Sequence, residues 1–169
     1  MSVTEASRRI PRPHHNFVPE YQMSGIPHVE TRELVNATLI GDDGNAAANG
    51  DADASISNIA SFKFEFKSVT RWVSINNHSN NAGKHIRVYF NETAAKTAYA
   101  TAANQDMHYF ELNGDQASQR LEIKCKELFI IPQTFGDNFT ASIAAGLTNV
   151  VAEDFPDQTK ANGFLGVED

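Results

Sequence analysis

The stretch Ser61 to Asn76, SFKFEFKSVTRWVSIN, decides how the rest of the chain can fold. Its three phenylalanines alternate with Lys and Glu, which is the two-residue period of a strand with one face in a core and one in water. The apolar residues change face near Thr70 and Arg71, which predicts a bulge or bend. A face of three phenylalanines must be covered by a second apolar layer, so we expect two layers packed against each other.

Other segments supply that second layer. Apolar alternation or short apolar runs predict further strands within residues 28–40, 84–91, 108–112, 120–132 and 140–152. Residues 92–106 form the only plausible helix, because this segment is rich in Ala and lacks Gly and Pro. Gly25-Ile26-Pro27 and Asn113-Gly114-Asp115 are turn signals.

The spacing of these elements predicts the fold class. Seven to nine short strands with one weak helix do not provide the crossover helices of a parallel sheet. An all-β, antiparallel two-sheet sandwich, in the form of a single jelly roll, fits best. An immunoglobulin-type sandwich is the alternative, although its paired cysteines are missing. The predicted core comprises Phe62, Phe64, Phe66, Val73, Ile75, Ile86, Val88, Phe90, Phe110, Leu112, Leu121 and Ile123.

The domain organisation follows from the ends of the chain. We expect an extended arm over residues 1–26, the β-sandwich over 27–152 and a C-terminal tail over 153–169. The arm carries three prolines, which exclude a helix, and its spaced apolar side chains favour an arm lying on another surface over a floppy terminus. The arm residues expected to make assembly contacts are Arg8, Arg9, Ile10, Arg12, Phe17, Tyr21 and Met23.

Charge argues against wholesale binding to nucleic acid. The net charge is −7 and the pI about 5.3, whereas affinity for nucleic acid depends on cationic contacts to phosphate. Three arginines in the arm are few for that task, so direct contact with nucleic acid is not expected. The basic arm and the acidic residues after position 150 have opposite charge, which favours association between subunits.

Cysteine usage and the termini indicate the compartment. Cys125 is the single cysteine, so no intrachain disulfide can form, and it is expected to be a small buried hydrophobe. The N-terminus has no secretory signal and no run is long enough to span a membrane, which predicts synthesis in a reducing cytosol. The sequons at Asn36, Asn77, Asn91 and Asn138 are therefore interpreted as chance matches.

No cluster of residues predicts a reaction. The six histidines include no His-x-His pair, and the motifs Cys-x-x-Cys, Gly-x-Ser-x-Gly and Gly-x-Gly-x-x-Gly are absent. The acidic loop 41–54 fails the EF-hand spacing, with Ala48 and Ala54 where Gly and Glu should stand. We predict no enzyme, no catalytic residue, no cofactor, no metal and no small-molecule substrate. The aromatic residues Trp72, Tyr89, Tyr99 and Tyr109 could instead line a sugar-binding face or pack under loops.

The layout resembles a known family. A proline-rich arm ends in Tyr21-x-x-Ser24-Gly25-Ile26-Pro27-x-Val29 and is followed by FKFEFKSVTRWVSINNHS, IRVYFN, HYFELN and LEIKCKELFI. In strand rhythm and layout this is similar to small single jelly-roll capsid proteins, namely the penton and minor capsid proteins of large icosahedral double-stranded DNA viruses such as those of algae. The resemblance implies a structural virion protein, made in the host cytoplasm, that forms a homo-oligomer, for example a pentamer, and contacts other capsid proteins. A carbohydrate- or receptor-binding module, lectin-like or of the fibre-head kind, is the alternative.

Overall fold

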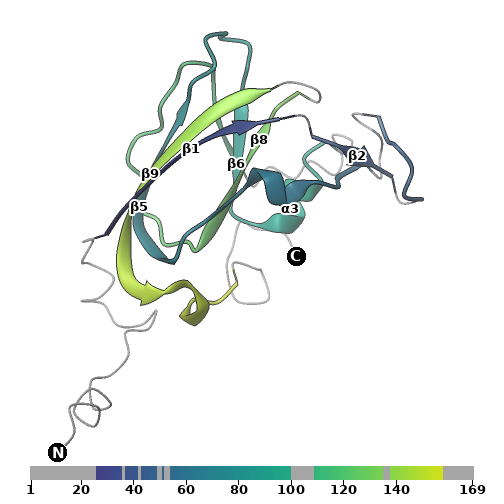
Figure 1. Ribbon diagram of the computed structural model, residues 1–169. Helices are drawn as coiled ribbons and strands as arrows, with labels where there is room; N and C mark the ends of the chain where they lie inside the picture. Colours follow the sequence, from purple (N-terminus) through teal and green to yellow (C-terminus); the bar gives the residue numbers. More distant parts are fainter. Residues whose placement is uncertain are drawn as a thin grey trace, which may run out of the picture.

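Two antiparallel sheets lie face to face in the computed structural model (Figure 1), which describes residues 26–35, 37–41, 43–48, 51, 54–99, 109–134 and 138–157. The elements are β1 (Ile26–Leu34), β2 (Leu39–Ile40), β3 (Ser55–Ile56), the 3-10 helix η1 (Ile59–Phe62), β4 (Lys63–Glu65), β5 (Ser68–Asn77), β6 (Ile86–Tyr89), α3 (Glu92–Lys96), β7 (Tyr109–Leu112), β8 (Glu127–Pro132), β9 (Phe139–Val151) and the 3-10 helix η2 (Ala152–Asp154).

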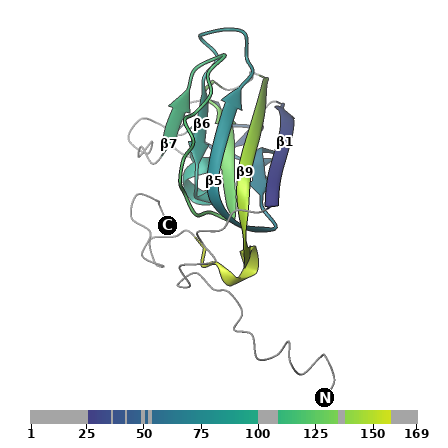
Figure 2. The same ribbon diagram turned by 90° about the vertical axis from the view of Figure 1, so that its left-hand side faces the viewer.

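The strand order defines the two layers. One sheet has the order β1-β9-β5 and the other β4-β8-β6-β7, with β2 and β3 as a small separate pair. Figure 2 shows β1, β9 and β5 side by side. All the strand pairs are antiparallel, and this confirms the predicted all-β, antiparallel sandwich. No helix in the described ranges is long and apolar enough to span a membrane.

An irregular segment, residues 117–123, extends the first sheet along the free edge of β5. Isolated bridges join Val73 to Leu121 and Asn76 to Ala117. The backbone N–H of Val73 donates to the Leu121 carbonyl at 2.9 Å, and that of Leu121 donates back at 2.8 Å. Sequence alternation predicted a strand through this segment, but the paired regular strand, β8, begins only at Glu127.

The antiparallel pairs are nested along the chain. β6 pairs with β7, the next strand along the chain, and β5 pairs with residues 117–123. Outside these, β4 pairs with β8, and β1 pairs with β9 from Ile26–Leu147 to Leu34–Phe139. The chain is therefore arranged as one long hairpin that has been rolled up, with four successive pairings between its two halves.

The central stretch Ser61–Asn76 crosses between the sheets. β4 lies in the four-stranded sheet and β5 in the three-stranded sheet, so the chain changes layer at Phe66 and Lys67. The register of β5 against β9 shifts on both sides of Thr70, which confirms the predicted bulge. Thr70 is fully buried, and its hydroxyl donates to the Ile123 carbonyl at 2.7 Å and accepts from the Cys125 N–H at 3.0 Å.

One hydrophobic cluster fills the space between the sheets. Among the predicted core residues the buried ones are Phe62, Phe64, Phe66, Val73, Ile75, Ile86, Val88 and Leu112. Those that are half-buried and pack against this cluster are Phe90, Phe110, Leu121 and Ile123. Phe155 packs with Val69 and Val150 in a second small cluster, so the first residues of the predicted tail lie against the sandwich.

The helix and its tyrosine differ from the prediction. Within the described residues the segment predicted as helix 92–106 is helical only from Glu92 to Lys96, and residues 100–108 lie outside the described ranges. Asn91 caps α3, its side-chain oxygen accepting from the N–H groups of Thr93 and Ala94. Tyr99 is buried because its hydroxyl can donate to the Pro132 carbonyl at 2.6 Å.

Two further expectations are corrected. Gly25-Ile26-Pro27 was predicted as a turn, but Ile26 and Pro27 already belong to β1 and pair with Leu147 and Gly146. Proline is tolerated there because β1 is an edge strand. Tyr89 stands between the apolar Val88 and Phe90, an alternation that predicts an outward side chain. Instead Tyr89 is buried, and burial raises the pKa of its hydroxyl to about 12 although Arg87 opposes the shift.

Candidate functional site

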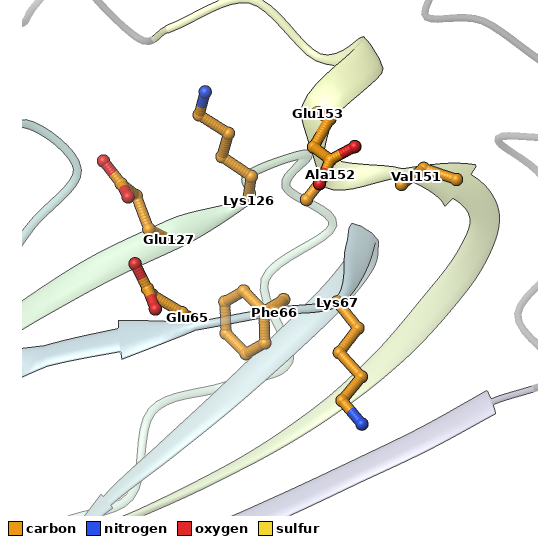
Figure 3. A pocket seen from close by; sticks show the side chains of 8 residues that line it. All are labelled: Glu65, Phe66, Lys67, Lys126, Glu127, Val151, Ala152 and Glu153. Carbon is orange, nitrogen blue, oxygen red and sulfur yellow. The ribbon is translucent and has the colours of Figure 1, made fainter.

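One end of the sandwich is hollowed into a groove of about 610 Å³, where the chain passes from β4 to β5 (Figure 3). The start of β8 and the end of β9 with η2 form its other walls. The lining residues are Glu65, Phe66, Lys67, Lys126, Glu127, Val151, Ala152 and Glu153.

Backbone hydrogen bonds hold the walls of this groove. The N–H of Phe66 donates to the Lys126 carbonyl at 2.9 Å, and the N–H of Ala152 donates to the Lys67 carbonyl at 3.3 Å. The Phe66 ring is buried and meets the ring of His28 edge-on, with 5.1 Å between centroids. The layer change at Phe66 and Lys67 therefore fixes the position of the groove.

Charged groups around the groove are paired with each other. The Lys63 ammonium lies 2.6 Å from Glu65 and 2.8 Å from Glu127. Burial opposes its charge, but the hydrogen bonds and charges of both carboxylates outweigh burial and raise the pKa of Lys63 above its ordinary value. Lys126 pairs with Asp157 and thereby lowers the pKa of that carboxyl.

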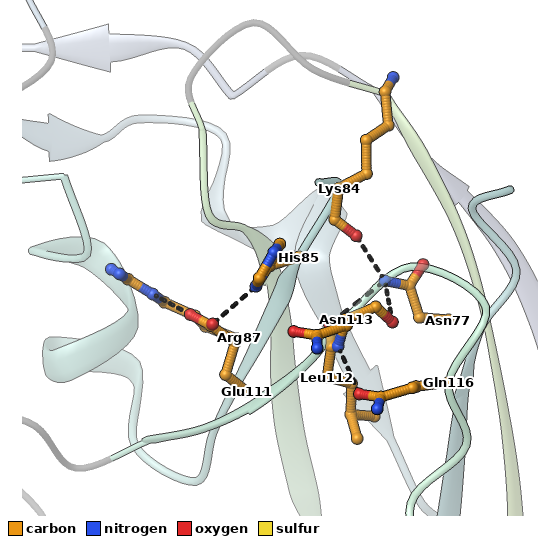
Figure 4. A network of polar contacts seen from close by, with 8 residues as sticks. All are labelled: Asn77, Lys84, His85, Arg87, Glu111, Leu112, Asn113 and Gln116. Atoms are coloured by element: carbon orange, nitrogen blue, oxygen red, sulfur yellow. Dashed lines mark hydrogen bonds and ion pairs between the residues drawn. The ribbon is translucent and has the colours of Figure 1, made fainter. Parts of the chain in front are cut away.

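A second polar cluster lies on β6 and β7 (Figure 4). His85 Nδ1 lies 2.7 Å from Glu111 Oε1, and Arg87 Nε donates to Glu111 Oε2 at 3.3 Å. Burial alone would raise the pKa of Glu111, but His85 and Arg87 outweigh it and lower that pKa below 4.5. The Arg87 guanidinium also lies 4.5 Å from the centre of the Tyr109 ring, so the cluster joins the two strands.

Asn77 is the centre of a buried hydrogen-bond network beside this cluster (Figure 4). Its fully buried amide donates to the carbonyls of Lys84, Leu112 and Asn113 at 2.9, 3.3 and 3.0 Å. Its oxygen accepts from the N–H of Ser79 at 3.1 Å. The side chain thus ties the end of β5 to the loop before β6 and to the turn after β7.

The structure separates the histidines that it describes. His28 contacts Phe66, His78 lies 2.7 Å from the Ser142 hydroxyl, and His85 pairs with Glu111. Within the described ranges no group of three His, Cys, Asp or Glu residues is placed to hold a metal ion. His14, His15 and His108 lie outside those ranges.

The aromatic residues considered for a sugar-binding face are divided between core and surface. Tyr89 and Tyr99 are buried. Trp72 and Tyr109 are half-buried, and an arginine lies over each ring, Arg120 at 5.0 Å from Trp72 and Arg87 at 4.5 Å from Tyr109. The four rings do not form one open platform.

Cys125 and two sequons occupy buried positions. Burial raises the pKa of the Cys125 thiol to about 12, against the smaller opposing effect of the Thr70 hydroxyl 3.3 Å away. The side chains of Asn77 and Asn91 are buried and hydrogen-bonded. In the acidic loop, the side chain and the N–H of Asn45 bind Asp43 and lower its pKa.

The predicted assembly residues of the arm, from Arg8 to Met23, lie outside the described residues.

Sequence reasoning missed Asn77 and the His85–Glu111 pair. Glu111 and Arg87 occupy alternate, polar positions of two neighbouring strands, which is the signal that could have paired them. Asn77 carried no such signal, because in the sequence it stands in a polar stretch that is typical of a loop.

Comparisons with protein-family models, with curated proteins and with solved structures found no match for this chain.

Proposed function

We propose that this chain is a structural virion protein, a single jelly-roll capsid subunit of the penton or minor capsid type. The observation that carries the proposal is the strand order. A jelly roll is a long antiparallel hairpin rolled into two Greek keys, so its eight strands form sheets in the order 1-8-3-6 and 2-7-4-5. If residues 117–123 count as the sixth strand and the small pair β2–β3 is left aside, the two sheets here have this order.

Assembly contacts fit the surfaces that this arrangement leaves open. The sandwich has open edges at β1, β4 and β7 within its described part, and subunits in closed assemblies bury such edges against neighbours. In this proposal the segment before β1 is an arm that contacts adjoining subunits or other capsid proteins. The subunit forms a homo-oligomer, for example a pentamer, and is located in the virion.

The alternative role, binding of a carbohydrate or receptor, requires an open aromatic face. Aromatic platforms bind sugars through the flat faces of their rings, and an arginine occupies one face of both Trp72 and Tyr109. This arrangement favours the assembly role over the binding role.

The test is the mass in solution of the full chain and of a chain lacking residues 1–25, measured by light scattering at several concentrations. The truncation stops before Ile26 because this residue already pairs with Leu147. We expect discrete oligomers larger than a dimer for the full chain, and a folded sandwich without these oligomers after truncation. An unfolded truncated chain, or a monomeric full chain that binds a glycan saturably, would contradict the proposal.

A further inference from the structure

The outer edge of β1 is the longest open edge in the described part of the structure. β1 has nine residues and pairs on one side with β9, and no described strand pairs with its other side. Val29, in the middle of this strand, is 74% exposed, which makes it the most exposed of the large apolar residues described. An open edge of this length offers a row of backbone N–H and C=O groups to another strand.

The charged residues on the inner side of β1 form a self-complementary pattern. His28, Glu30 and Arg32 alternate along the strand and are each about one-quarter to one-third exposed. These side chains connect β1 to the segment around β4 in the other sheet. The His28 ring contacts Phe66, and the Arg32 side chain donates to the Lys63 carbonyl at 2.7 Å. The order is basic, acidic, basic, so a second β1 that runs in the opposite direction presents the same order of basic and acidic residues.

We infer that β1 pairs with β1 of a second copy of this chain, antiparallel, about a two-fold axis at Val29. In this register Val29 lies opposite Val29 of the second copy, and each His28 lies opposite a Glu30. Apolar residues directly across a strand pair stabilise it. A register centred on Glu30 would place two glutamates opposite each other, which is unfavourable.

The exposure of Val29 favours the register at Val29 over the one centred on Thr31. Pairing at Val29 covers the most exposed large apolar side chain of the described residues with a second valine. Pairing at Thr31 would place Val29 opposite Glu33 and leave it without an apolar partner.

Pairing through β1 forms a closed dimer and does not continue into a longer assembly. A two-fold contact uses the same edge on both copies, so no β1 edge remains for a third chain. The inference does not rest on the proposed capsid role, because it concerns a dimer that persists when residues 1–25 are removed. Absence of the larger oligomers in the full chain would contradict the proposed function and leave this pair intact.

The first experiment is disulfide trapping in the full chain. Directly opposite residues of an antiparallel pair have Cα atoms about 4.5–5.5 Å apart, within the range of a disulfide. The native Cys125 is fully buried, so it does not compete. Under mild oxidation we expect V29C to form a covalent dimer, and T31C and V35C to remain monomeric on a non-reducing gel. Trapping of T31C in place of V29C would overturn the register.

The second experiment measures self-association by analytical ultracentrifugation. V29K places two lysines opposite each other and should weaken the dimer at least about ten-fold. V35K is the matched control, since Val35 is also a half-exposed valine but lies just beyond the end of β1. A wild-type chain that never dimerises, or equal dimerisation of V29K and V35K, would overturn the inference.

Discussion

Gly114 lies directly against the backbone carbonyl of Asn81, so that a Cβ on Gly114 would collide with this carbonyl and with that of Ser79. The turn after β7 is thereby packed onto the loop that precedes β6. In this turn the residue with a positive φ is Asp115, at 58°, whereas Gly114 is required for close packing.

The substitution G114A should destabilise the fold. The new methyl group meets backbone, which cannot rotate away, and overpacking of this kind costs about 1–3 kcal/mol. Urea denaturation followed by tryptophan fluorescence measures the free energy of unfolding. The control is G83A, where the added Cβ would meet only the Asn81 side chain at 3.4 Å. Equal stability of the two variants would contradict this account of Gly114.

Replacing Asn77 should also destabilise the fold. N77A removes the amide that donates to the carbonyls of Lys84, Leu112 and Asn113, and loss of this buried hydrogen-bonding group should cost about 1–3 kcal/mol. N77D should be no better, because it brings a carboxylate to the same three carbonyl oxygens. Chemical denaturation checks both, with the exposed Asn80→Ala as control. Near wild-type stability of N77D would exclude the proposed role of the amide.

Stability should depend on pH through Glu111. Its pKa in the folded protein is below the ordinary value of 4.5, so its ion pairs with His85 and Arg87 stabilise the fold above that pH. This contribution is lost as the pH falls through the folded-state pKa. The difference in free energy of unfolding between wild type and E111Q should therefore shrink from about pH 6 to about pH 2. E33Q, on the exposed edge strand, is the control; a pH-independent difference for E111Q would refute the coupling.

Cys125 should not react with thiol reagents while the protein is folded. Burial raises its pKa to about 12 and excludes the reagent, so almost no thiolate is available at about pH 8. We expect one thiol to be titrated in guanidinium chloride and none in buffer, measured by absorbance with a chromogenic disulfide. Rapid labelling in buffer would show that the segment before β8 opens readily.

The parts of the fold that were predictable from the sequence depend on local alternation. Phe62, Phe64 and Phe66 alternate with charged residues, and all three are buried. The change of face at Thr70 marks a real bulge. These patterns reflect only the two faces of a strand, so they cannot show that β4 and β5 belong to different sheets. That change of layer is set by pairing with β8 and β9, far away in the chain.

The sites were less predictable for a related reason. Tyr99 is polar at one end, and it is buried because the Pro132 carbonyl happens to lie within reach of its hydroxyl. Asn77 stands in a polar stretch that is typical of an exposed loop, yet the carbonyl of Lys84 and two carbonyls from the distant turn after β7 converge on its amide. Such convergence is a property of the tertiary structure, and no spacing in the sequence encodes it.

The nested pairing of the strands also sets the order in which the chain can fold. Among the nested pairs β6 and β7 enclose the shortest intervening segment, whereas Ile26 must find Leu147 across nearly the whole described chain. Closing long loops costs more entropy, and proteins dominated by such contacts fold in about milliseconds to seconds. We expect the pair β1–β9 to close last. The apolar surface that β1 covers then stays exposed longest during refolding, and substitutions in β1 should mainly speed unfolding while leaving the folding rate nearly unchanged.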